Sequence, residues 1–213
     1  MGIDFEYISG QTPLDEDEKE GLLIESLSSR GELDEFEQLN IERAIEWSIS
    51  RKFVERIILT EEFVKSLHKQ MFGEVWSWAG QFRKSNKNIG VDWTIIGIEL
   101  KKLLDDTEFW IKNRSYNPDE IAIRFKHRLV RIHCFPNGNG RHSRMMADII
   151  IESIFEMEYL TGDIPVWFGQ MQPGRSILAP SKKRMEEILN PCWILQEASD
   201  TCKNIFNCTC NNN

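Results

Sequence analysis

The residues best suited to chemistry lie together in the segment His133-Cys134-Phe135-Pro136-Asn137-Gly138-Asn139-Gly140-Arg141-His142-Ser143-Arg144. Gly138 and Gly140 would let backbone N–H groups approach a ligand closely at the start of a helix, which favours an anion. Arg141 and Arg144 would lie in the first turn of that helix, where cations oppose the helix dipole, so they suggest a phosphate partner. His133, with an ordinary pKa near ~6.5, suits a general base. The spacing therefore predicts a phosphate-handling site with a base beside it.

A purely structural interpretation of this segment is also available. A lone Gly-x-Gly pair is a weak signal, and a corner between two helices can hold a core histidine and surface arginines. A base, a glycine loop and two arginines within twelve residues are more specific than any of these features alone. The chemical interpretation is therefore favoured.

Helices are predicted on both sides of this loop and over most of the chain. Asn117-Pro118-Asp119-Glu120 is a strong start signal for a helix that runs to His133. Apolar residues from Met145 to Phe155 mark a second central helix. Further helices are expected at 22–27, 33–50, 60–73, 94–113 and 182–189, and a short β-hairpin at 81–91. The predicted fold is mostly α, with one small hairpin.

Composition narrows the class of protein. The 213 residues carry a net charge of −8, which disfavours general nucleic-acid binding. The sequence contains no apolar run near the ~20 residues of a membrane span, and its acidic start lacks the apolar core of a signal peptide. Five cysteines, an odd number, fit free thiols in a reducing compartment. We therefore expect a cytoplasmic protein with no membrane partner.

The segment from His133 to Arg144 resembles the Fic family signature, HPFx(D/E)GNGRxxR. Residues 67–72 and 75–83 are similar to the segment before the family's flap, and Lys87-Asn88-Ile89-Gly90 looks like the flap itself. The resemblance covers about residues 20–155. With Arg30-Gly31-Glu32-Leu33, the chain looks most like the Fic subgroup called mobile mystery protein B.

The resemblance implies a Fic-type helical bundle with a small β-hairpin flap. It also implies a nucleotidyltransferase that moves AMP from ATP to a Tyr, Thr or Ser hydroxyl of a target protein. By position, His133 would deprotonate that hydroxyl and Phe135 would anchor the loop. The phosphates would be bound by Asn137, Gly138, Asn139, Gly140, Arg141 and Arg144, with Arg144 at the terminal phosphate. The target would dock on the flap residues Lys87, Asn88, Ile89 and Gly90.

Two residues depart from the family pattern. Cys134 replaces the usual proline, which the loop should tolerate. Asn137 replaces the acid that holds Mg²⁺, and its amide oxygen can bind a hard cation only without formal charge. ATP and Mg²⁺ are the expected substrate and cofactor, with Asn137 as a weak metal ligand.

An inhibitory motif is also implied, because Ser28 and Glu32 match the (S/T)xxxE(G/N) pattern of class II Fic proteins, although Leu33 replaces the final residue. Glu32 would pair with Arg144 in the place of the terminal phosphate. Ser29 with Glu32 is also a capping box, and both roles are compatible. In some relatives the same glutamate supports AMP removal, so the reverse reaction is left open.

Composition and the resemblance together divide the chain into an acidic arm at 1–20, an inhibitory helix region at 21–50, a Fic core at 51–160 and an irregular extension at 161–213. His68 is expected to be structural, and His142 is expected to face solvent. The alternatives are a Doc-like phosphotransferase, whose loop would carry lysine in place of Gly140, and a weakened Fic binding module, which Asn137 favours. A DNA-binding regulator is disfavoured by charge. A homodimer is left open.

Overall fold

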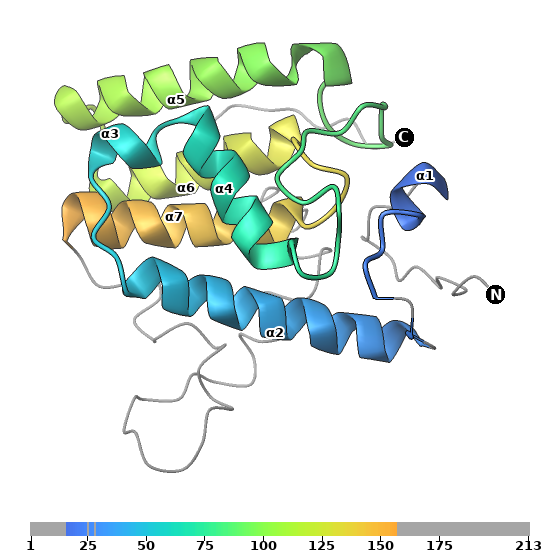
Figure 1. Cartoon of the computed structure of the whole chain (residues 1–213). Coiled ribbons are helices and arrows are strands. Elements are labelled where there is room, and N and C mark those ends of the chain that lie inside the picture. Colours follow the sequence, from blue (N-terminus) through green and yellow to red (C-terminus); the bar gives the residue numbers. More distant parts are fainter. Residues whose placement is uncertain (1–15, 25, 28, 157–213) are drawn as a thin grey trace, which may run out of the picture.

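The computed structural model describes residues 16–24, 26–27 and 29–156, which form a helical bundle (Figure 1). Its elements are α1 (Glu16–Lys19), α2 (Arg30–Ile49), α3 (Glu55–Ile58), α4 (Glu61–Phe72), the 3₁₀ turn η1 (Trp93–Ile95), α5 (Ile96–Lys112), α6 (Pro118–Ile132) and α7 (Asn139–Phe155). The mostly α fold is confirmed. The helix expected at 182–189 and the cysteine-containing tail lie outside the described residues.

α4 is the central helix, and its local sequence explains its bounds. The Thr60 side chain accepts a hydrogen bond from the Phe63 N–H at 3.1 Å, and two glutamates follow in the first turn, where the dipole favours them. Phe63, Leu67 and Met71 recur at helical spacing and are buried. The helix ends at Gly73, as the sequence predicts, so α4 presents one apolar face to its neighbours.

α6 and α7 form an antiparallel pair that carries the loop between His133 and Asn139. Pro118 stands at the first helical position of α6, where its missing N–H has no cost. α5 covers α6 on one side of the bundle, and α2 packs against α4 on the opposite side (Figure 1). The two ends of the loop are therefore held by helices that are themselves packed.

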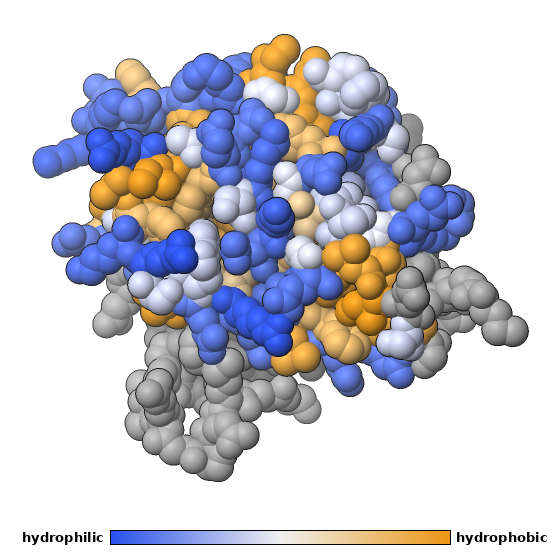
Figure 2. Space-filling view, viewed as in Figure 1, coloured by the Kyte–Doolittle hydropathy of each residue, from blue (hydrophilic) through white to orange (hydrophobic). Residues whose placement is uncertain are grey.

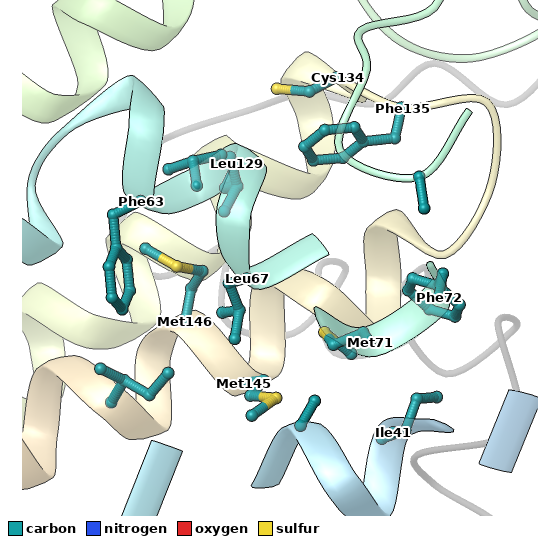
Figure 3. Close-up of a cluster of buried hydrophobic side chains, with 14 of the residues drawn as sticks. Ile41, Phe63, Leu67, Met71, Phe72, Leu129, Cys134, Phe135, Met145 and Met146 are labelled. Atoms are coloured by element: carbon teal, nitrogen blue, oxygen red, sulfur yellow. The ribbon is translucent and has the colours of Figure 1, made fainter. Parts of the chain in front are cut away.

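The core joins side chains from three of these helices. Leu67 and Met71 of α4 meet Met145 and Met146 of α7, with Ile41 of α2 below them (Figure 3). Hydrophilic side chains cover much of the face seen in Figure 2, with apolar patches between them. This core fixes α2, α4 and α7 relative to one another.

The predicted β-hairpin at 81–91 is wrong, because the described chain has no strand there. The loop does not pair with itself: the Arg83 N–H donates to the Cys134 carbonyl at 3.0 Å, and the Val91 N–H to the Ile132 carbonyl at 3.3 Å. The Arg83 guanidinium then joins the two arms of the loop by donating to the carbonyls of Ser85 and Val91. Side-chain hydrogen bonds, rather than a strand ladder, hold the two arms together.

The helix predicted at 22–27 is also wrong. The residues described there are not helical, and Leu22 makes an isolated antiparallel bridge with Trp76. The Leu23 N–H donates to the Val75 carbonyl at 2.9 Å, and the Ser77 N–H to the Gly21 carbonyl at 2.8 Å. Backbone groups committed to a distant loop are not available to a local helix.

Candidate active site

His133 ends α6 in a strained conformation, with φ at +57°, which is uncommon for a residue other than glycine. Its backbone N–H donates to the Leu129 carbonyl at 3.2 Å, so the chain turns out of the helix at this residue. The residue is only 4% exposed. The pKa of His133 is lowered to about 4, mainly by burial and also by the charges of Arg83 and Lys87, against an opposing hydrogen bond with the Val130 backbone. The imidazole is therefore neutral at pH 7.

Arg83 ties the 81–91 loop to His133. The residue is 2% exposed, and its Nε donates to the His133 carbonyl at 2.7 Å. The same group holds the two arms of the loop together, as described above. The position of the loop over His133 is thus set by hydrogen bonds rather than by sheet pairing.

Gly90 is the point where this loop touches the histidine. It has φ of +106°, and a Cβ built on it would lie 2.7 Å from the His133 Cβ. Only glycine can adopt this conformation at such an approach without strain. Of the other predicted flap residues, Asn88 and Ile89 are exposed, whereas the Lys87 side chain is 4% exposed and paired with Glu18 of α1.

The glycine loop is closed by Asn139. Its side-chain amide donates to the Phe135 carbonyl at 2.7 Å and accepts from the Phe135 N–H at 2.9 Å. Gly138 has φ of +75°, and a Cβ there would lie 2.6 Å from the ring of Phe72. The loop backbone therefore approaches α4 closely, and Asn139 fixes its shape from within.

The buried His68 of α4 supports the glycine loop through hydrogen bonds and ring stacking. The Gly80 N–H donates to His68 Nδ1 at 3.1 Å, so His68 Nε2 carries the proton and donates to the Asn137 carbonyl at 3.0 Å. The His68 ring stacks on Phe135 with centroids 3.7 Å apart. The structural role predicted for His68 is confirmed.

The solvent-facing role predicted for His142 is wrong. The residue is 1% exposed, and its Nε2 lies 3.0 Å from the Val64 carbonyl, to which it donates. Burial lowers the pKa of His142 to about 4, against the opposing hydrogen bond with Val64. The helix turns this position toward α4, which places a neutral histidine in the core.

Cys134, the departure next to His133, is buried and lies at the Phe135 side of the core (Figure 3). Burial raises the pKa of its thiol to about 12, so the thiolate that would be needed for a nucleophile is absent at neutral pH. The residue packs as a small apolar group.

Arg141 contacts a glutamate that the motif did not single out. Its Nη1 donates to Glu37 Oε2 at 2.7 Å, and Glu37 Oε1 accepts from Trp76 Nε1 at 2.7 Å. Sequence reasoning missed Glu37, although a signal exists: it lies on the buried stripe of α2 between Leu33 and Ile41, where a carboxylate is unexpected.

The remaining predicted residues lie around this centre. Arg144 is half-buried on α7, one turn beyond Arg141, and Gly140 is half-buried in the first turn. Glu32 is exposed in the first turn of α2, where its N–H donates to the Ser29 hydroxyl at 3.3 Å. The capping role of Ser29 is thus present, and Ser28 lies outside the described residues.

The described residues contain no cluster of three or more His, Cys, Asp and Glu side chains that could hold a metal. The Asn137 side-chain oxygen accepts from the Gly138 N–H at 2.6 Å, so it is turned into the loop. This donor set alone does not fit a resident Mg²⁺, which takes carboxylates and phosphate oxygens. Within the described part of the chain, no helix is long and apolar enough to cross a membrane.

Part of the chain is similar to a known protein family. Residues 58–151 match the model of the Fic/DOC family. The chain is similar to proteins named protein adenylyltransferase Fic, from Drosophila mojavensis (27% identity over 107 residues, 48% of this chain and 21% of that protein) and from Aedes aegypti (27% over 97 residues, 44% and 19%). It therefore spans only about a fifth of the length of these relatives.

Solved structures agree on the fold. The N-terminal FIC domain of a Bartonella effector protein, Bep8, from Bartonella sp. 1-1C has a TM-score of 0.53 at 16% identity and covers 79% of this chain and 90% of that one. The BepC protein from Bartonella tribocorum with bound AMPPNP has a TM-score of 0.51 at 16% identity, covering 65% and 80%. A Fic domain from Bartonella quintana with bound ADP has a TM-score of 0.50 at 17% identity, covering 83% and 87%.

Proposed function

We propose that this chain, whose residues 58–151 match the Fic/DOC family model, is a protein adenylyltransferase. It transfers AMP from ATP to a Tyr, Thr or Ser hydroxyl of a target protein. The observation that carries the proposal is the geometry of the loop: Asn139 holds it closed between a neutral histidine, His133, and an arginine, Arg141. The names of the curated relatives and the AMPPNP and ADP bound to structural relatives support it.

His133 acts on the acceptor. The hydroxyl oxygen attacks the α-phosphorus of ATP, the bond from that phosphorus to the bridging β-phosphate oxygen breaks, and pyrophosphate leaves. The hydroxyl proton passes to the neutral imidazole, which is the form that His133 holds at pH 7. A bound triphosphate would raise the pKa of His133, because nearby negative charge favours the imidazolium.

The glycine loop and the start of α7 bind the nucleotide. The first N–H groups of a helix have no partner within the helix, and they point toward the region where Gly138, Asn139 and Gly140 lie. Arg141 neutralises charge at the transferred phosphate, and Arg144 binds the terminal one. Phosphoryl-type transfer depends mainly on such positioning and charge stabilisation, which a preformed loop supplies.

The acceptor segment lies along the 81–91 loop. Gly90 brings the loop backbone against His133, and the exposed Asn88 and Ile89 offer polar and apolar contacts to a partner. Mg²⁺, when bound with ATP, would neutralise the phosphates. Asn137 is a single weak candidate ligand, and none of the steps above depends on it.

A brake on the reaction is part of the proposal. Glu32 would pair with Arg144 and take the place of the terminal phosphate, so that ATP binds in an unproductive pose. Its support is the match of Ser28 and Glu32 to the family's inhibitory pattern in the sequence.

The test separates AMP transfer from phosphate transfer. Purified protein is incubated with a cell lysate and with ATP radiolabelled at either the α- or the γ-phosphate, with Glu32→Gly run beside the wild type. Label from the α-phosphate alone on protein supports AMP transfer. Label from the γ-phosphate would instead support the Doc-like phosphotransferase, and label from neither would support the binding module.

A further inference from the structure

Glu37 is an almost fully buried carboxylate, 3% exposed, on a helix face that is otherwise mainly apolar. Both of its oxygens are engaged: Oε1 accepts from Trp76 Nε1 and Oε2 from Arg141 Nη1, each at 2.7 Å. The ion pair joins residues 104 positions apart in the sequence. The Glu37 side chain is 4% exposed, and the Arg141 side chain is 21% exposed. It connects α2 directly to the first turn of α7.

Burial of this carboxylate is a poor way to stabilise the fold. Removing a charge from water has a large desolvation free energy. Well-packed apolar residues of similar size commonly stabilise a fold as well as a buried ion pair does, or better. The cost is offset only because Trp76 and Arg141 satisfy the carboxylate. The ion pair has good hydrogen-bond geometry but contributes little to the free energy of unfolding. We therefore infer that its role is to orient Arg141.

Arg141 is held from two directions. Its guanidinium carbon lies 4.8 Å from the centroid of the Phe72 ring, in a cation–π contact. Phe72 in turn packs against Gly138, because a Cβ on that glycine would lie 2.6 Å from the ring. Phe72 therefore sets the distance between the guanidinium and the glycine loop, and Glu37 sets its rotation.

The contacts with Glu37 and Phe72 leave Arg141 able to bind an anion. A guanidinium has five N–H donors, and a monodentate contact with one carboxylate oxygen uses one of them. The Arg141 side chain is 21% exposed, so part of it faces solvent. Glu37 thus engages Nη1 of the guanidinium and leaves other donors for a phosphate.

We propose that Glu37 is a positioning residue, which orients Arg141 toward the α-phosphate at which AMP transfer takes place. This inference rests on the proposed function of the site. Without the carboxylate, Arg141 keeps its charge and still attracts a nucleotide, more strongly because a neighbouring negative charge is gone. It loses the fixed direction that the transition state needs, so the transfer rate falls while nucleotide affinity does not.

The test uses Glu37→Gln in the full chain. Glutamine still accepts from Trp76 Nε1 but carries no charge. The expected result is a transfer rate lower by about tenfold or more, as misplacement of a catalytic group by ~1 Å can cost 10². The dissociation constant for AMPPNP is expected to be unchanged or lower, while the melting temperature falls, because Arg141 then keeps a partly buried charge without its carboxylate. Glu35→Gln, exposed on the same helix, is the matched control and should behave as wild type in all three.

Two results would overturn the proposal. One is an unchanged transfer rate. The other is a lower rate accompanied by weaker AMPPNP binding, which would make Glu37 a structural support of the nucleotide site. If Glu37→Gln does not fold, Trp76→Phe decides: it removes the indole donor but keeps the ring, and it should lower the rate in the same direction. An unchanged rate in Trp76→Phe would then reject the role of Glu37.

A second readout keeps this inference separate from the proposed function. The phosphorus NMR resonance of the α-phosphate in bound AMPPNP should shift in Glu37→Gln and stay in place in Glu35→Gln. A wild type that binds AMPPNP but transfers no AMP, with this shift present, refutes AMP transfer and keeps the role of Glu37. The absence of the shift, with an unchanged rate, refutes the role of Glu37 alone.

Discussion

Gly90 lies directly against His133, with the α-carbon of the loop so close that a Cβ there would approach the His133 Cβ to 2.7 Å and Arg83 Nη2 to 2.9 Å. The loop that is proposed to receive the target therefore touches the proposed base through bare backbone. Neither Arg83 nor the His133 backbone can move aside easily, because the Arg83 guanidinium donates to the His133 carbonyl at 2.7 Å.

Gly90→Ala is therefore expected to reduce AMP transfer by at least about tenfold, because the loop must shift from the base and positional errors of ~1 Å cost up to 10². The affinity for AMPPNP should not change, since the phosphate loop is elsewhere. Gly97→Ala is the control: nothing lies within 4 Å of its Cβ, and alanine within α5 should stabilise the protein by about 0.5–1 kcal/mol. Normal transfer by Gly90→Ala would show that the loop does not determine access to His133.

The buried histidines predict an acid-sensitive fold. Burial lowers the pKa values of His133 and His142 to about 4, and it lowers the pKa of His68 well below its ordinary value. In the unfolded chain each titrates near ~6.5, so between pH ~6.5 and ~4 the unfolded state binds more protons. The free energy of unfolding therefore falls as pH falls through this window. Above pH ~6.5 these histidines no longer change the free energy of unfolding with pH.

His142→Gln tests this sign, because glutamine keeps a donor for the Val64 carbonyl but does not titrate. Between pH 6 and pH 5 the variant should lose roughly 1.4 kcal/mol less unfolding free energy than the wild type, the value for one proton per pH unit. Urea denaturation at a series of pH values measures it. Parallel curves for the two proteins would mean that His142 titrates normally in the folded state.

Asn137→Asp is expected to strengthen Mg²⁺ dependence and raise transfer, because a carboxylate binds a hard cation better than an amide does. Aspartate can still accept the Gly138 N–H that Asn137 accepts at 2.6 Å, so the loop should keep its shape. Asn117→Asp makes the same chemical change at the N-cap of α6 and should have no effect on transfer. An unchanged or lower rate across a Mg²⁺ titration would place the metal elsewhere.

Much of the fold could be predicted because its signals are local. The start at Thr60 and the stop at Gly73 bracket α4, and the Asn117-Pro118 pair marks the start of α6, since caps and apolar stripes act within a few residues. The loop at 81–91 could not be predicted in this way. Its shape depends on bonds from Arg83 to His133, 50 positions away.

The site was predictable in part for the same reason. His133 and Arg141 belong to one short segment, so a motif finds them. Glu37 belongs to no motif and reaches Arg141 across 104 positions. His142 was misplaced because the sequence places it beside the loop, whereas the helix turns it into the core against Val64.

Glu32→Gly tests the proposed brake. Removal of the carboxylate should free Arg144 for the terminal phosphate and raise self-modification or target labelling by at least about tenfold, since a charged hydrogen bond contributes ~1.5–3 kcal/mol. Arg144→Ala added to Glu32→Gly should erase the gain. Asp34→Gly, also in the first part of α2, controls for the loss of an acidic residue from the helix. A wild-type rate in Glu32→Gly would leave Glu32 as a cap residue only.

The central claim is that His133 is the base of an AMP transfer carried out on the glycine loop. The most direct measurement is the rate at which α-labelled ATP modifies protein, in the wild type and in His133→Ala, beside the AMPPNP dissociation constant of each. The account predicts a rate lower by about 10²–10⁴ in His133→Ala with nearly unchanged AMPPNP affinity, because a base acts on the hydroxyl and does not hold the nucleotide. Equal labelling by the two proteins would contradict it.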